Sequence, residues 1–265
     1  MVGKRTLGSK IAIQVILAVL GLFYVIPLAN VVVSSLQGAG LRNYTYLFTS
    51  GFPIMRMIFN SALVSFLQVT LIVAVASMSA FAFSKIRFPG RDTLYLLVLL
   101  TMSISMLNFI SPLFQTMKAL GWINTYAALV LPAATFWLPV AILILKNYYD
   151  SLGIELLEAV MIEGGGFFTA WLRVYAPLSR PAVINVVVFA FINSWNDYLN
   201  PLLFSRSQDM RTLPMAVISL SSSIYGARPE VVFACLVIMA VPSVIVYLLF
   251  QDHLGEGMTA GAVKG

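Results

Sequence analysis

The sequence predicts an all-α membrane protein that crosses the bilayer with six helices and keeps both termini in the cytoplasm. Of its 265 residues, 60% are hydrophobic and 10% are charged, whereas a soluble domain has roughly 45–50% apolar and about 25% charged residues. Five long stretches contain no Lys, Arg, Asp or Glu, and about 20 apolar residues in a helix are enough to cross a bilayer. We therefore expect a single transmembrane domain over residues 1–265 and exclude a water-soluble globule.

Six spans are expected in chain order. They lie at about residues 11–34, 60–84, 94–115, 124–146, 183–205 and 231–250. The first span is too long for a cleaved signal peptide, whose apolar core has 7–15 residues. The second carries small residues at four-residue spacing, Ala76, Ala80 and Ser84, which allow another helix to approach closely. The fifth is the least regular, because Asp197 interrupts it.

Prolines occur within or near five of the six spans. They are Pro27, Pro112, Pro132 with Pro139, Pro201 and Pro242. A proline removes a backbone hydrogen bond, and broken helices are common in transporters. Because proline is also enriched in membrane helices generally, each of these positions predicts either a static kink or a functional break.

The orientation follows from the basic residues. With the N-terminus in the cytoplasm, ten of them lie inside (Lys4, Arg5, Lys10, Lys85, Arg87, Arg91, Lys146, Arg173, Arg180 and Lys264) and six outside (Arg42, Arg56, Lys118, Arg206, Arg211 and Arg228). The excess is greatest early in the chain, where loops usually dominate topology. Basic residues scattered between apolar runs form no nucleic-acid-binding stripe.

Residues 150–181, between the fourth and fifth spans, are neither a span nor a plain loop. Their apolar positions repeat as in a short amphipathic helix, at Leu156, Leu157, Val160 and Met161. Glu155 and Glu158 fall on another face, and three glycines from Gly164 end the helix. A helix lying on lipid would carry Lys and Arg instead. An acidic and apolar helix predicts insertion into a groove on a soluble partner.

Several motifs in this chain are similar to one protein family. Glu158-Ala159 is followed by Gly164 six residues after the glutamate, and by Pro177 thirteen residues later. This order resembles the EAA motif of permease subunits of binding-protein-dependent ABC importers. Other stretches agree, namely Asn60-Ser61, Phe81 to Lys85, Phe88 to Arg91, Trp195 to Asp197, Thr212 to Pro214 and the run Gly257 to Gly265. They resemble the carbohydrate-uptake branch, which includes the smaller maltose permease subunit.

The resemblance also has departures. The family usually has Ala, Asp, Ala and Leu where this chain has Val160, Glu163, Gly165 and Ala176. Glu163 keeps the charge of the aspartate, whereas Gly165 adds backbone freedom.

The resemblance implies a type I importer permease fold and a non-catalytic transport subunit. ATP and Mg²⁺ would be bound by two cytoplasmic ATP-binding-cassette subunits, and a second permease, expected to be a different chain, would complete the sugar path. An extracytoplasmic sugar-binding protein would deliver the substrate at the inner membrane of a prokaryote. We call residues 150–181 the coupling segment. The residues implied to contact the ATPase are Leu156, Leu157, Glu158, Ala159, Val160, Met161, Glu163, Gly164 and Pro177.

The sequence contains no motif for ATP binding, catalysis or zinc binding. It lacks the glycine-rich P-loop that binds ATP phosphates, and one histidine and one cysteine are too few for a zinc site. We expect no catalytic residue, cofactor or metal in this chain. Asn196 and Asp197 are predicted to belong to the substrate path or a gate, although Asp197 alternatively suits a solvated helix end. An ion-coupled secondary transporter that acts without an ATPase remains the alternative function.

Overall fold

The computed structural model describes residues 7–221 and 228–259, with side chains over 13–221 and 228–252. No strand occurs in these residues. Four helices are long and apolar enough to span a membrane, and up to six spans result if each of two bent helix pairs counts as one. The predicted all-α polytopic class is confirmed. The chain divides into two compact units, residues 1–52 with 217–240 and residues 53–216 with 241–265.

The first unit contains α1 (Leu7–Ser35), α2 (Arg42–Thr49), the end of α12 (Pro214–Ser221) and the start of α13 (Pro229–Thr259). The amide of Asn43 donates to the carbonyls of Ser35 (2.9 Å) and Gln37 (2.8 Å), which fixes the turn between α1 and α2. None of the most apolar window of α1 is buried. This is the surface of a helix that contacts lipid or another subunit.

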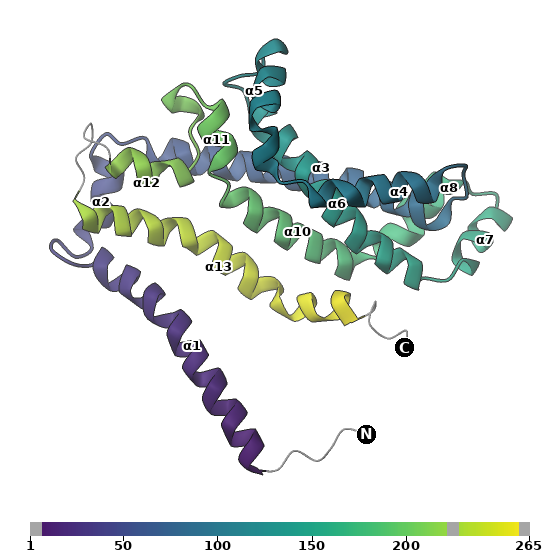
Figure 1. Cartoon of the computed structure of the whole chain (residues 1–265), viewed down its shortest axis with the longest axis horizontal. Helices are drawn as coiled ribbons and strands as arrows, with labels where there is room; N and C mark the ends of the chain where they lie inside the picture. The colour runs from purple at the N-terminus through teal and green to yellow at the C-terminus, as the bar shows by residue number, and fades with distance from the viewer. Residues whose placement is uncertain (1–6, 222–227, 260–265) are drawn as a thin grey trace. The chain divides into compact units, whose positions relative to one another are not determined.

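The second unit is built on α3 (Ile54–Lys85), α6 (Tyr126–Ser151) and α10 (Arg180–Trp195), which run alongside one another (Figure 1). Ala76 and Ala80 of the predicted small-residue face are fully buried in the core between these helices. Pro132 and Pro139 lie inside α6 without ending it. Small side chains therefore set the close helix packing, as the sequence predicts.

The predicted third span, 94–115, is not one helix. It is formed by α4 (Arg91–Leu100), the short turns η1 (Thr101–Ser103) and η2 (Met106–Phe109), and α5 (Ile110–Ala119). The two halves meet at 93°. The backbone is extended at Ile104 and Ser105, where the Ser105 hydroxyl accepts the amide of Leu107 at 3.3 Å. Serine caps of this kind start a new helical turn, so the span breaks here without a proline.

The predicted fifth span, 183–205, is also discontinuous. It starts with α10, loses helical geometry over residues 196–198, and resumes as α11 (Leu199–Phe204). At its other end, α10 meets the helical stretch Phe167–Leu178 at a bend of 78°. The break falls on Asn196 and Asp197, the two residues predicted to belong to the substrate path.

Candidate functional site

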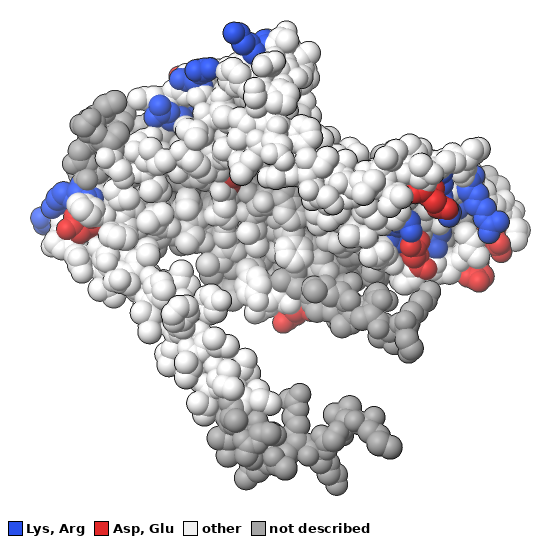
Figure 2. Space-filling model, viewed as in Figure 1, with Lys and Arg blue, Asp and Glu red and all other residues white. Residues whose placement is uncertain are grey.

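The coupling segment folds as a short helix followed by an irregular helical return. The helix α7 (Glu155–Ile162) lies at the end of the second unit that α4 and α8 (Phe167–Ala170) also occupy (Figure 1). The π-helical turn η3 (Trp171–Tyr175) and α9 (Ala176–Leu178) then lead into α10. Figure 2 shows acidic and basic side chains gathered over this end. The short helix predicted from the sequence is present.

Glycine ends α7 in the predicted place. Gly164 has a φ of +82°, which glycine adopts without strain. The amide of Gly165 donates to the carbonyl of Val160 (2.8 Å) and that of Gly164 to Met161 (3.1 Å). These two bonds form a Schellman motif, which satisfies the last carbonyls of the helix. The chain therefore turns sharply after Glu163.

The two faces of α7 have different surroundings. Leu157 is buried, and Leu156 and Val160 pack against the core of the second unit. The exposed residues of the helix and its flanks are Ile154, Glu155, Glu158, Ala159, Met161, Ile162, Glu163 and Gly164. Ile162 is 87% exposed, although the sequence pattern did not single it out. Three of the four amphipathic positions, Leu156, Leu157 and Val160, thus face the helix's own chain, whereas Met161 is exposed. The exposed surface is acidic with an isoleucine at its end.

Aromatic side chains hold the coupling segment on α3. Tyr149 and Ser77 share a hydrogen bond of 2.8 Å, and the Trp171 indole donates to the same serine oxygen at 2.9 Å. Tyr175 is fully buried, and its hydroxyl donates to the carbonyl of Gly153 at 3.0 Å. Burial raises the pKa of the Tyr175 phenol, and nearby Glu155 raises it further. The sequence alone did not indicate this anchoring role of Trp171 and Tyr175, which becomes visible only in the folded chain.

Lys85, the last residue of α3, contacts both flanks of α7. Its ammonium donates to the carbonyl of Leu152 at 2.6 Å and lies 5.5 Å from the centre of the Tyr175 ring. Beside it, Asp150 accepts from Ser84 and pairs with Lys146, both at 2.7 Å. The residues that precede and follow α7 are therefore attached to the same end of α3.

A cavity of about 710 Å³ lies at the helix break between α10 and α11. Most of its lining is apolar or aromatic, and we call it the polar cavity after the four Asn and Asp side chains in its wall. The lining residues are Met106, Ala133, Phe136, Trp137, Val140, Ile192, Asn193, Asn196, Asp197, Tyr198, Leu199 and Asn200. The Asp197 carboxylate accepts the backbone amide of Asn200 (3.2 Å) and its side-chain amide (2.6 Å). Asn196 donates to Ile192 and to the Ser243 hydroxyl. Irregular backbone at membrane depth is tolerated where it lines such a cavity.

The Asn60-Ser61 motif holds the outer loop, residues 205–213, at the start of α3. The side-chain amide of Asn60 donates to the carbonyls of Asp209 (2.7 Å) and Arg211 (2.8 Å), and its oxygen accepts from Tyr126 (2.9 Å). The Ser61 hydroxyl accepts the amide of Leu213 at 2.8 Å. All the side-chain hydrogen-bonding groups of Asn60 are thus used within the chain.

No metal-binding group of three or more His, Cys, Asp or Glu residues occurs in the described part of the chain. The expectation that this chain binds no cofactor itself stays a prediction.

The comparisons with known proteins decide the family. The family described as binding-protein-dependent transport system inner membrane component matches residues 72–260. This chain belongs to that family. The permease is 35% identical over 207 residues to the trehalose/maltose transport system permease protein MalG of Thermococcus litoralis, covering 78% of this chain and 74% of the relative. It is 30% identical over 273 residues to the arabinooligosaccharides transport system permease protein AraQ of Bacillus subtilis, covering 97% and 96%. The resemblance seen in the sequence motifs is confirmed.

A solved structure shares the fold of the permease. A chain in the crystal structure of a bacterial ABC transporter involved in the import of the acidic polysaccharide alginate matches with a TM-score of 0.77. The match covers 94% of this permease and 98% of that chain, at 20% sequence identity. The predicted type I permease fold is confirmed.

Proposed function

We propose that this chain is one of two permease subunits of an ATP-driven sugar importer in the inner membrane of a prokaryote. It forms the translocation path together with a second, different permease. Two ATP-binding-cassette subunits bind ATP and Mg²⁺, and an extracytoplasmic binding protein delivers the sugar. The sugar class follows from the two relatives, whose names specify trehalose/maltose and arabinooligosaccharides.

The observation that carries this proposal is the placement of α7. One face of the helix is fixed in the core through Leu157, while Glu158 and Ile162 remain exposed. A helix held so firmly by its own chain can transmit a push from outside as a rigid body, whereas a free loop would absorb it. We assign ATPase contact to the exposed positions, and we assign a supporting role to Leu156, Leu157 and Val160. Pro177, in α9, would shape the return to α10.

The polar cavity supports a path for sugar. Aromatic faces and hydrogen-bonding groups that converge in one cavity suit a ligand that is apolar on its ring faces and polar at its hydroxyls. Trp137 and Tyr198 supply aromatic groups, and Asn193 and Asp197 supply polar ones. We assign Asn196 and Asp197 to the wall of this path, where the interrupted helix exposes their side chains.

Co-purification tests the coupling assignment. The wild type should bring the ATPase and the second permease out of detergent-solubilised membranes, and Ile162→Asp should lose the ATPase while it keeps the second permease. The acidic side chain would place a charge at the most exposed apolar position of the proposed contact, where an unpaired buried charge is costly. The control Ile218→Asp changes an equally apolar side chain, 55% exposed, far along the chain in α12.

One result would replace the proposal with the alternative function. If the wild type purifies alone and moves maltose into vesicles without ATP, the protein is a secondary transporter. If Ile162→Asp and Ile218→Asp retain the ATPase equally, α7 is not the contact.

A further inference from the structure

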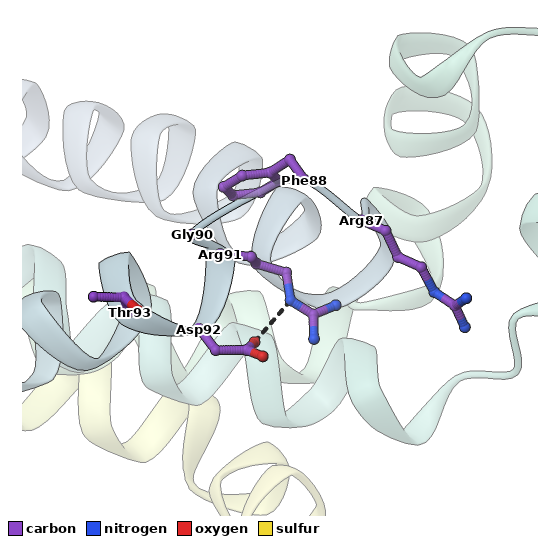
Figure 3. A pocket seen from close by; sticks show the side chains of 6 residues that line it. All are labelled: Arg87, Phe88, Gly90, Arg91, Asp92 and Thr93. Atoms are coloured by element: carbon purple, nitrogen blue, oxygen red, sulfur yellow. Dashed lines mark hydrogen bonds and ion pairs between the residues drawn. The ribbon is translucent and has the colours of Figure 1, made fainter.

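A second pocket opens at the loop between α3 and α4, outside the coupling segment and the polar cavity. Its volume is about 350 Å³ and its lining residues are Arg87, Phe88, Gly90, Arg91, Asp92 and Thr93 (Figure 3). We call it the arginine pocket. Nothing in the transport function proposed above uses it.

Two guanidinium groups extend to the same side of the loop at this pocket (Figure 3). Arg87 is exposed, and Arg91 uses its Nε to bind the Asp92 carboxylate at 2.8 Å. Within the described residues, no other hydrogen bond or ion pair is made by either guanidinium. The Asp92 carboxylate would repel an anion in the pocket. Its side chain is 86% exposed, however, so water screens its charge. Both arginines keep donors for a ligand with two or more acceptor oxygens.

The start of α4 adds backbone donors to the same pocket. Gly90 precedes the ten-residue helix with a φ of +78°, and no side chain caps it. The first amides of a helix have no acceptor within the helix, and they carry a partial positive charge. Asp92 and Thr93, in the first turn, line the pocket. The Arg91 amide donates to the carbonyl of Phe88 at 3.3 Å, which leaves the amides of Asp92 and Thr93 in the first turn. Arginine side chains and these two amides together favour a phosphate group.

The surroundings of the pocket are those of a membrane interface. Phe83 lies 6.3 Å from Phe88 and 5.5 Å from Tyr95, measured between ring centres, and aromatic residues concentrate at the level of lipid headgroups. On α4, Leu94, Leu97 and Leu100 follow at three-residue spacing with about half of each side chain exposed. An anion in the pocket would therefore have an apolar strip directly beside it.

We propose that the arginine pocket binds the phosphodiester of an anionic phospholipid. Arg87 and Arg91 hold the phosphate oxygens, and the leucine strip of α4 contacts an acyl chain. Inorganic phosphate shares the chemistry of the headgroup, but it would make no use of the leucine strip. The proposal does not depend on which solute the permease transports.

Native mass spectrometry of the complete importer complex tests the proposal. The complex is purified in detergent and titrated with phosphatidylglycerol, with phosphatidylcholine, and with inorganic phosphate. We expect the complex to retain phosphatidylglycerol in preference to phosphatidylcholine. In the double variant Arg87→Gln with Arg91→Gln, phosphatidylglycerol should bind about tenfold more weakly or worse, because two charge-assisted contacts are lost. The control, Lys118→Gln with Arg206→Gln, removes the same charge at two residues that do not line the pocket and should bind as the wild type does.

The variant Leu97→Asn separates the two phosphate sources. It should weaken binding of phosphatidylglycerol and leave that of inorganic phosphate unchanged. Melting temperatures in phosphatidylcholine verify that each variant is folded. Equal phosphatidylglycerol binding by the arginine double variant and its control would overturn the proposal. Displacement of the lipid by millimolar inorganic phosphate, with no effect of Leu97→Asn, would assign the pocket to free phosphate instead.

Discussion

Position 165 has room for a hydrogen atom but not for a methyl group. A Cβ built on Gly165 would lie 2.6 Å from Cγ1 of Val160 and 3.1 Å from the carbonyl oxygen of the same residue. We expect Gly165→Ala to destabilise the turn after α7 by about 1–3 kcal/mol, as overpacking does. Val160→Ala removes the clashing methyl group, so Gly165→Ala should cost much less in that background. Thermal unfolding of the two single variants and the double variant gives the interaction energy between the positions.

This geometry also explains two departures from the family pattern. The sequence alone shows only that Val160 and Gly165 both stand where the family usually has alanine. The Schellman turn brings the two side-chain positions together, so a larger residue at one requires a smaller residue at the other. Additive effects of Val160→Ala and Gly165→Ala would show that the two positions do not interact.

Tyr175 gives a residue-scale prediction about pH. Its pKa is raised by burial above the ordinary value of 10.0. The unfolded chain therefore loses the phenolic proton first, and the stability that the buried neutral phenol contributes is present below pH 10 and is lost as the pH rises further. At pH 8, Tyr175→Phe should lose about 0.5–1.5 kcal/mol with the hydrogen bond to Gly153. The stability difference between the wild type and Tyr175→Phe should shrink above pH 10, and a constant difference would contradict this.

At the scale of elements, the outer loop depends on one asparagine. Asn60 binds two carbonyls of the loop and is fully buried. We expect Asn60→Ala to leave the Arg211 carbonyl without this donor and the Asp209 carbonyl with only the Arg56 side chain, at 3.3 Å. Hydrogen exchange of residues 205–213 should become about tenfold faster. The control Thr116→Ala removes a hydroxyl that binds only Pro112 within its own helix. Equal exchange rates in the two variants would mean that the loop is held by other contacts.

The sequence predicted most elements but not where they break. Long charge-free runs predict α1, α3, α6 and α13, because a helix that crosses lipid needs about 20 apolar residues. Proline was a poor guide: Pro27, Pro132, Pro139 and Pro242 all lie inside helices. The third span breaks at Ile104-Ser105 within an uncharged run, since a serine cap there competes with helical continuation. The local sequence is compatible with a continuous helix and with a broken one, and tertiary packing decides between them.

The sequence predicted the position of α7, but it did not predict which of its apolar residues would be buried. Periodicity located α7 and the glycines located its end. Hydrophobicity alone could not say which apolar residues face the chain and which face a partner, because both kinds of surface are apolar. Leu157 and Ile162 are five residues apart in one helix, and only the packing of α7 against the core of the second unit distinguishes them.

At the scale of the whole molecule, the proposed function requires that motion of α7 reaches the helices around the proposed substrate path. Lys85 connects α7 with α3, the helix that packs against α6 and α10 of the cavity wall. Lys85 ends α3, and its ammonium donates to the carbonyl of Leu152 just before α7. We expect Lys85→Met to leave the exposed surface of α7 unchanged, so the importer should still assemble and hydrolyse ATP. The sugar transported per ATP should fall several-fold, because α7 would then move without pulling α3.

Reconstituted vesicles allow this measurement, with ATP hydrolysis and sugar uptake followed in the same preparation. The matched control is Lys146→Met, which removes a lysine that pairs with Asp150 one turn away in the same helix and does not contact Leu152. If the control couples normally and Lys85→Met does not, α3 receives its motion through Lys85. An unchanged ratio of sugar transported to ATP hydrolysed in Lys85→Met would show that the aromatic contacts of Tyr149, Trp171 and Tyr175 transmit the motion without Lys85. Loss of the ATPase from the Lys85→Met complex would instead show that Lys85 is needed for assembly.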